Sequence, residues 1–156
     1  MARVIMTCGK ICCGKTTYAR KLSQEGKAVI LSIDEVMLSL FPDGAGELHD
    51  IYALRSERYL LSLSLQLIQA GVNVILDWGL WTKSQRDRLR QFYREHGADA
   101  EIHYLKISPE EWERRIRTRN AQRPEGSYYV DEGLLKKVNE LFQEPSGEEV
   151  DLIVSV

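Results

Sequence analysis

Eight residues near the start of the chain have the types and spacing of a loop that binds phosphate. They read Gly-Lys-Ile-Cys-Cys-Gly-Lys-Thr at positions 9–16 and match the pattern G-x-x-x-x-G-K-T throughout. Glycines let such a loop turn its backbone N–H groups toward phosphate oxygens, and the N-terminal end of a following helix adds positive charge. We expect nucleotide phosphates to contact the run and the residue after it: Gly9, Lys10, Ile11, Cys12, Cys13, Gly14, Lys15, Thr16 and Thr17.

Two side chains of this loop have separate expected roles. Lys15 would neutralise the β and γ phosphates, which makes it a candidate catalytic residue as well as a binding residue. The hydroxyl of Thr16 would be a ligand of Mg²⁺. The alternative is a chance match in a glycine-rich loop, but the apolar segment before the run and the helical periodicity after it argue against chance.

Two aspartates each follow an apolar segment that reads as a β-strand. If a bound nucleotide gives its phosphate to an alcohol, a carboxylate is needed near the acceptor hydroxyl. Asp34 is the candidate base and Glu35 the fallback, and both would contact the acceptor. The alternative is that Asp34 only caps a short helix over 35–41. Asp77 would hold Mg²⁺ through water, and the alternative for Asp77 is a plain turn.

An arginine-rich segment follows the fourth apolar segment of the chain. Arg115, Arg119 and Arg123 recur every four residues, so on one helix they form a single stripe. In a lid over about 115–130, Arg115 and Arg119 would contact ATP, while Arg119 and Arg123 would offset the negative charge that develops during catalysis. The alternative is a solvated helix face whose arginines pair with glutamates earlier on the same helix.

Two tryptophans lie close together after the third apolar segment. Trp78 and Trp81 flank Gly79-Leu80, and their rings could stack on a sugar or an apolar acceptor. The alternative for one of them is core packing.

Three cysteines cluster near the N-terminus, and two of them lie inside the phosphate loop. Their odd number and the lack of a metal-ligand repeat predict reduced thiols. One hypothesis is that oxidation of Cys12 or Cys13 blocks ATP binding. The alternative is that both are small residues tolerated in a tight loop.

Strands and helices are expected to alternate along the whole chain. Five apolar segments read as strands: 3–8, 27–33, 72–76, 102–107 and 150–156. Thr82 with Gln85, and later Asp131, have the pattern of helix starts. Alternating strands and helices form a mostly parallel sheet that is covered on both faces and binds its ligand at the carboxyl ends of the strands. Asp34, Asp77 and the glycine loop would all meet at that edge.

Length and composition predict one folded domain over 1–156. The chain has 156 residues, of which 44% are hydrophobic, and this is enough for a single core. A formal net charge of −2 gives no basic excess of the kind that nucleic-acid binders use. No segment is long and apolar enough for a membrane span or a signal peptide, so we expect a cytoplasmic protein without a membrane partner, either monomer or dimer.

On these motifs the chain resembles the small P-loop kinases of the AAA_33 type, which are relatives of polynucleotide kinases, zeta toxins and chloramphenicol phosphotransferase. The resemblance rests on the phosphate loop, Ser32-Ile33-Asp34-Glu35, Leu76-Asp77 and the arginines before Arg123-Pro124. It implies an α/β, three-layer P-loop NTPase fold with five strands in the order 2-3-1-4-5, helices on both faces and an arginine-bearing lid. It also implies ATP and Mg²⁺ as cofactors and a catalytic aspartate at Asp34.

The segment after Asp34 indicates what kind of molecule accepts the phosphate. Polynucleotide kinases carry an arginine shortly after the catalytic aspartate, and residues 35–38 contain no base. Against Arg55 alone, the acids in this segment are Asp34, Glu35, Asp43, Glu47, Asp50 and Glu57. We therefore expect a neutral or cationic small-molecule hydroxyl, in a nucleoside, a sugar or an antibiotic-like compound. The alternatives are a 5′-hydroxyl polynucleotide kinase and an ATP-binding switch or ATPase without a small-molecule acceptor.

Overall fold

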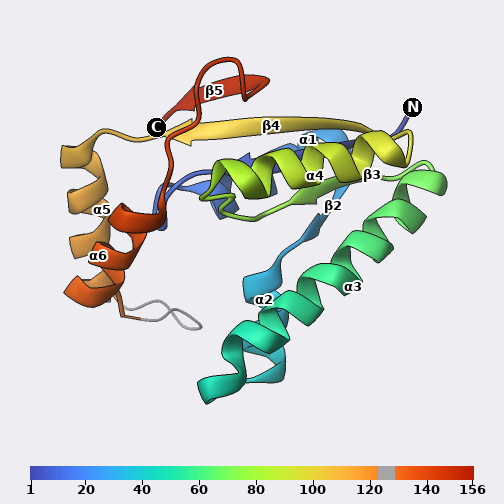
Figure 1. Cartoon of the computed structure of the whole chain (residues 1–156). Helices are drawn as coiled ribbons and strands as arrows, with labels where there is room; N and C mark the ends of the chain where they lie inside the picture. Colours follow the sequence, from blue (N-terminus) through green and yellow to red (C-terminus); the bar gives the residue numbers. More distant parts are fainter. Residues whose placement is uncertain (123–128) are drawn as a thin grey trace.

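Five parallel strands form one sheet in the order β2-β3-β1-β4-β5 in the computed structural model, which describes residues 1–122 and 129–156 (Figure 1). The strands are β1 (Arg3–Cys8), β2 (Ala28–Leu31), β3 (Asn73–Leu76), β4 (Asp99–Lys106) and β5 (Leu152–Ser155). All four strand pairings are parallel. The expected strand order is confirmed, and the carboxyl ends of the strands lie at one edge of the sheet.

The strand register brings the candidate site residues to that edge. Met6 of β1 is level with Leu76 of β3, and Leu76 is level with Leu31 of β2. The chain leaves all three strands within two residues of this level, so the glycine loop, Asp77 and the start of the next helix emerge together.

Helices cover both faces of the sheet. They are α1 (Lys15–Gly26), α2 (Ile33–Leu40), α3 (His49–Gln69), α4 (Lys83–Glu95), α5 (Pro109–Gln122) and α6 (Glu132–Leu141), with a short 3₁₀ turn at Gly46–Leu48. Side chains alternate along β1, so Val4 and Met6 pack with Leu60 of α3 and Leu89 of α4, whereas Ile5 packs with α1 on the other face. The result is a three-layer α/β arrangement.

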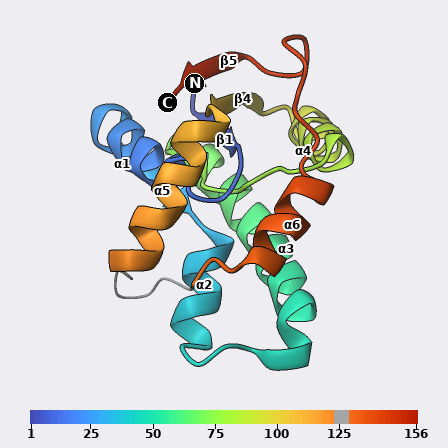
Figure 2. The same ribbon diagram turned by 90° about the vertical axis from the view of Figure 1, so that its left-hand side faces the viewer.

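The last two helices extend beyond the carboxyl edge of the sheet. Trp112 and Ile116 of α5 form a separate apolar cluster with Val138 of α6 and with Ile11 of the glycine loop. Figure 2 shows α2 and the first turns of α3 lying below α5 and α6. The phosphate loop is therefore packed directly against the helix that carries the arginines.

Helix starts agree with the sequence at two places and differ at a third. Thr82 and Gln85 form a reciprocal capping box at α4, and the Asp131 carboxylate accepts a hydrogen bond from the Leu134 N–H at α6. The second strand, however, ends at Leu31 rather than at position 33, and Ser32 is the cap of α2 because its hydroxyl accepts the Glu35 N–H.

The placement of Asp34 is therefore corrected. It does not end a strand and it does not cap a helix, because it lies inside the first turn of α2.

None of the described helices is both long and apolar enough to cross a membrane.

Candidate active site

The loop between β1 and α1 is shaped by close contacts that exclude larger residues. A Cβ atom at Gly9 would lie 2.7 Å from the Cys13 sulfur, and one at Gly14 would lie 3.0 Å from a guanidinium nitrogen of Arg115. Gly14 also has φ 97°, and Cys12 adopts a left-handed φ of 58° that is unfavourable for a residue with a side chain. The two glycines of the motif are thus required by packing and conformation.

Lys15 lies at the start of α1 and reaches back over the loop. Its ammonium donates hydrogen bonds to the carbonyl oxygens of Gly9, at 3.1 Å, and Lys10, at 2.6 Å. The side chain is half-buried. The positive charge is therefore fixed beside the backbone that the motif turns toward phosphate.

Thr16 and Asp77 meet at the carboxyl edge of the sheet. The Thr16 hydroxyl donates to a carboxylate oxygen of Asp77 at 2.8 Å, and the Asp77 N–H is held by the carbonyl of Leu31 at 3.1 Å. Burial raises the pKa of Asp77, the Asp34 carboxylate raises it further, and the Thr16 hydrogen bond and the Lys15 charge act against both. A bound cation would stabilise the charged form of this partly buried carboxylate. A carboxylate beside a hydroxyl group provides the oxygen ligands that Mg²⁺ prefers.

Asp34 and Glu35 lie on the first turn of α2 and are both exposed. The negative charge of Asp34 raises the pKa of Asp77, so the two carboxylates interact electrostatically. The role of Asp34 as a base at the acceptor stays a prediction.

Two of the arginines on α5 contact the phosphate loop. Arg115 donates to the Cys13 carbonyl at 3.0 Å, and Arg119 donates to the Cys12 sulfur at 3.1 Å. Glu111 accepts from Arg115 at 2.8 Å and steadies it. The expected stripe thus lies on the loop at both positions that the structure describes, whereas Arg123 lies outside the described residues.

The other arginines of α5 fit the solvated-face interpretation. Arg114 pairs with Glu111 and Arg117 pairs with Glu113, and both arginine side chains are more than two-thirds exposed. One helix therefore carries a loop-facing stripe and a solvated stripe.

The two tryptophans have different environments. Trp78 is buried, 6% exposed, and its indole N–H donates to the Leu31 carbonyl at 3.1 Å, so core packing describes it and we do not retain it as an acceptor contact. Trp81 is half-buried against the α5–α6 cluster and lies over Gly79, where a Cβ would meet its indole nitrogen at 2.5 Å. Stacking of an acceptor stays a prediction for Trp81 alone.

The cysteines also differ from one another. All three are free thiols. Burial raises the pKa of the Cys13 thiol, which disfavours its reactive thiolate, whereas Cys12 is half-buried against Arg119. The oxidation hypothesis stays a prediction, with Cys12 as the accessible thiol.

Sequence reasoning missed the residues that join the glycine loop to the loop after β3. Thr7 is fully buried, and its hydroxyl accepts the Trp78 N–H at 3.1 Å and donates to the Trp78 carbonyl at 2.8 Å. The Gly9 N–H donates to the Gly79 carbonyl at 2.9 Å. The one sequence signal for this contact was a polar residue, Thr7, inside an otherwise apolar strand.

The fold and a family model place the chain among known proteins. A family described as an AAA domain, AAA_33, matches residues 4–145. This match covers most of the chain, so the chain belongs to the AAA_33 family. No curated protein matches the sequence at a significant level.

Solved structures with similar folds include three kinases or provisional kinases. A protein from Chloroflexus aurantiacus, described provisionally as a kinase, is 17% identical with a TM-score of 0.76, and the match covers 99% of this chain and 84% of that chain. A gluconokinase from Sinorhizobium meliloti is 16% identical with a TM-score of 0.69, covering 99% and 82%. The APS kinase CysC of Mycobacterium tuberculosis, in complex with AMPPNP and APS, is 18% identical with a TM-score of 0.68, covering 99% and 88%. These likenesses establish the P-loop NTPase fold.

Proposed function

We propose that the protein is a kinase that transfers the γ-phosphoryl group of ATP to a hydroxyl of a small molecule. The observation that carries this proposal is the 2.8 Å contact between Thr16 and Asp77, which joins the phosphate loop to a desolvated carboxylate. A loop that merely resembled the motif would have no reason to place these two metal-binding groups together.

The nucleotide would lie along the loop from Gly9 to Thr17. Backbone N–H groups and Lys15 would bind its phosphates, while Thr16 and Asp77 would hold Mg²⁺, which when bound neutralises phosphate charge. The APS kinase with a similar fold was solved with the ATP analogue AMPPNP, and this supports ATP as the nucleotide.

Asp34 is proposed as the base at the acceptor. Its carboxylate would accept the proton of the acceptor hydroxyl as the oxygen forms its bond to the γ-phosphorus and the bond to the ADP oxygen breaks. Glu35 is exposed beside it and would help to position the acceptor. Two observations support this role: Asp34 is exposed, and it is close enough to Asp77 for its charge to raise the pKa of that carboxyl group.

Arginines from α5 would stabilise the negative charge that spreads over the transferring group. Arg115 and Arg119 already contact the phosphate loop, and Arg123 is proposed to join them from the sequence pattern alone. Because guanidinium groups are permanently charged and planar, they suit phosphate oxygens.

The acceptor is proposed to be neutral or cationic. Five acids are exposed between the start of α2 and the start of α3: Asp34, Glu35, Asp43, Glu47 and Asp50. Glu57 does not belong to this group, because its carboxylate forms an ion pair with Arg88 of α4 at 2.7 Å. Five exposed acids against Arg55 alone within residues 34–57 disfavour a phosphorylated acceptor or a nucleic-acid strand.

The test is a transfer assay with γ-labelled ATP, Mg²⁺ and a panel of nucleosides, sugars, aminoglycosides and 5′-hydroxyl oligonucleotides, alongside Lys15→Ala. Label that appears on a small neutral or cationic alcohol, and is lost in Lys15→Ala, supports the proposal. Label on oligonucleotides alone would replace it with a polynucleotide kinase. Tight ATP binding without transfer to any acceptor would favour a nucleotide switch.

A further inference from the structure

One arginine of α4 is buried although the rest of that helix is highly charged. The Arg86 side chain is 1% exposed and faces the core on the same side of the helix as Leu89 and Tyr93. A permanent charge at such a depth is costly unless every donor is paired, so its partners indicate what it does.

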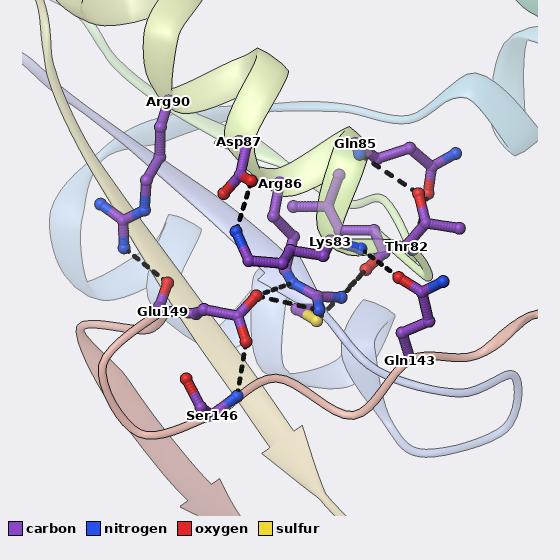
Figure 3. Close-up of polar contacts among 11 residues, drawn as sticks. Thr82, Lys83, Gln85, Arg86, Asp87, Arg90, Gln143, Ser146 and Glu149 are labelled. Carbon is purple, nitrogen blue, oxygen red and sulfur yellow. Dashed lines mark hydrogen bonds and ion pairs between the residues drawn. The ribbon is translucent and has the colours of Figure 1, made fainter.

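Glu149 fixes the guanidinium in one orientation (Figure 3). One carboxylate oxygen of Glu149 accepts from Arg86 Nε at 3.3 Å and from Nη2 at 3.1 Å, and the other accepts from the Ser146 N–H at 2.7 Å. This paired geometry holds the planar group and leaves Nη1 directed elsewhere.

The remaining nitrogen of Arg86 holds the loop that follows β3. Nη1 donates to the carbonyl oxygen of Leu80 at 2.9 Å, and the Cys8 thiol contacts the same oxygen at 3.5 Å. Leu80 has a left-handed φ of 48°, which a leucine does not favour by itself. The buried charge therefore stabilises an otherwise unfavourable backbone conformation.

The loop held in this way carries the groups that meet the nucleotide site. It begins at Asp77, and the residue before Leu80 is Gly79, whose carbonyl accepts the Gly9 N–H at 2.9 Å. A shift of Leu80 would therefore move the phosphate loop at Gly9 and the carboxylate at Asp77.

We propose that Arg86 is a positioning residue for nucleotide and metal binding, acting through the carbonyl of Leu80. This inference rests on the proposed function, because it assumes that the loop and Asp77 bind ATP and Mg²⁺. The contacts of Arg86 are with Leu80 and Glu149, so it would act on the nucleotide site only through the backbone of the loop after β3.

Arg90 provides a matched control one turn further along α4. It donates to the Glu149 carbonyl at 2.9 Å and to Asp151 at 2.6 Å, so it ties the same C-terminal segment to the same helix. Within residues 1–122 and 129–156, Arg90 forms no hydrogen bond or ion pair with the loop after β3. Loss of Arg90 should therefore lower stability without moving the nucleotide site.

The experiment compares Arg86→Lys, Arg86→Met and Arg90→Met in the full chain. Three quantities are measured: urea unfolding, affinity for a fluorescent ATP analogue with Mg²⁺ or with EDTA, and amide hydrogen exchange of the segments around Gly9 and Asp77 without nucleotide. Lysine keeps the charge and the helix propensity but lacks the rigid fork, so Arg86→Lys carries the test if Arg86→Met does not fold.

We expect Arg86→Lys to be folded and to bind the Mg²⁺ complex about 10- to 100-fold more weakly, with faster exchange at both segments. Arg90→Met should match the wild type in affinity and exchange even where its stability is lower. Unchanged affinity and unchanged exchange in folded Arg86→Lys would overturn the inference, as would equal losses in Arg90→Met. If the wild type bound no nucleotide, the proposed function would fail, and exchange at Gly9 would still decide whether Arg86 positions the loop.

Discussion

Thr16 and Asp77 lie 61 positions apart in the sequence, yet the hydroxyl of the first donates to the carboxylate of the second at 2.8 Å. The strand register produces this contact, because β1 and β3 are neighbours and the chain leaves both at the same edge. Burial raises the pKa of Asp77, so its charged form gains from a nearby cation more than an exposed carboxylate would.

The first prediction concerns this carboxylate. Asp77→Asn keeps the size of the side chain but removes its charge, so we expect the Mg²⁺ concentration for half-maximal ATP binding to rise about 10- to 100-fold. Titration of Mg²⁺ at fixed ATP measures the effect. Asp87→Asn is the control, because Asp87 is an exposed partner of Lys83 on α4. Equal Mg²⁺ dependence in the two variants would remove Asp77 from the metal site.

The second prediction concerns the arginine at the Cys12 sulfur. Arg119→Met should lower kcat by about 10²- to 10³-fold, with a smaller change in KM for ATP, if the guanidinium stabilises charge mainly in the transition state. Arg117→Met is the control, since Arg117 is exposed on the same helix and pairs with Glu113. A rise in KM with unchanged kcat would instead indicate ground-state binding.

The third prediction concerns Gly79 in the loop after β3. A Cβ atom there would approach the Trp81 indole nitrogen to 2.5 Å, so Gly79→Ala should force the ring away and cost about 1–3 kcal/mol of unfolding free energy. ATP affinity should also fall, because the Gly79 carbonyl holds the Gly9 N–H. Gly26→Ala, where a Cβ meets nothing within 4 Å, is the control and should be neutral in both urea unfolding and binding.

The fourth prediction concerns pH and Glu149. The Ser146 N–H and the Arg86 guanidinium hold the pKa of Glu149 below its ordinary value. A lowered pKa in the folded state stabilises the protein above the ordinary glutamate pKa of about 4.3, and this stabilisation is lost as the pH falls through the folded-state value. Glu149→Gln should therefore be less stable by about 1.5–3 kcal/mol at pH 7, and the difference should narrow in acid. A difference that stays constant between neutral and acidic pH in urea unfolding would contradict this.

The apolar segments and the glycine loop predicted the strands and the edge where the site lies, because these are local signals, whereas the strand order was implied by the resemblance to small P-loop kinases. β1 was expected at its observed bounds, Arg3–Cys8. The end of β2 was not, since an isoleucine after Ser32 continues the apolar pattern although the serine hydroxyl caps the next helix.

Residues that act through long-range backbone contacts could not be predicted. Arg86 belongs to a helix whose charged composition indicates a solvent-exposed helix. The structure shows that Arg86 is buried on the same side of α4 as Leu89 and Tyr93. The contact of Gly9 with Gly79, and the left-handed backbone at Leu80, depend on how two loops meet in space. Such contacts have no pattern in a single sequence.

The role of Asp34 as catalytic base is tested by a single-turnover assay of phosphoryl transfer in Asp34→Asn, with ATP affinity measured on the same protein. Asp34 is exposed on α2 and is not required for packing, so the variant should fold and bind ATP as the wild type does. We predict that transfer to the acceptor slows by about 10²- to 10⁴-fold while ATP affinity is retained. Undiminished transfer in Asp34→Asn would contradict the proposed role of this carboxylate.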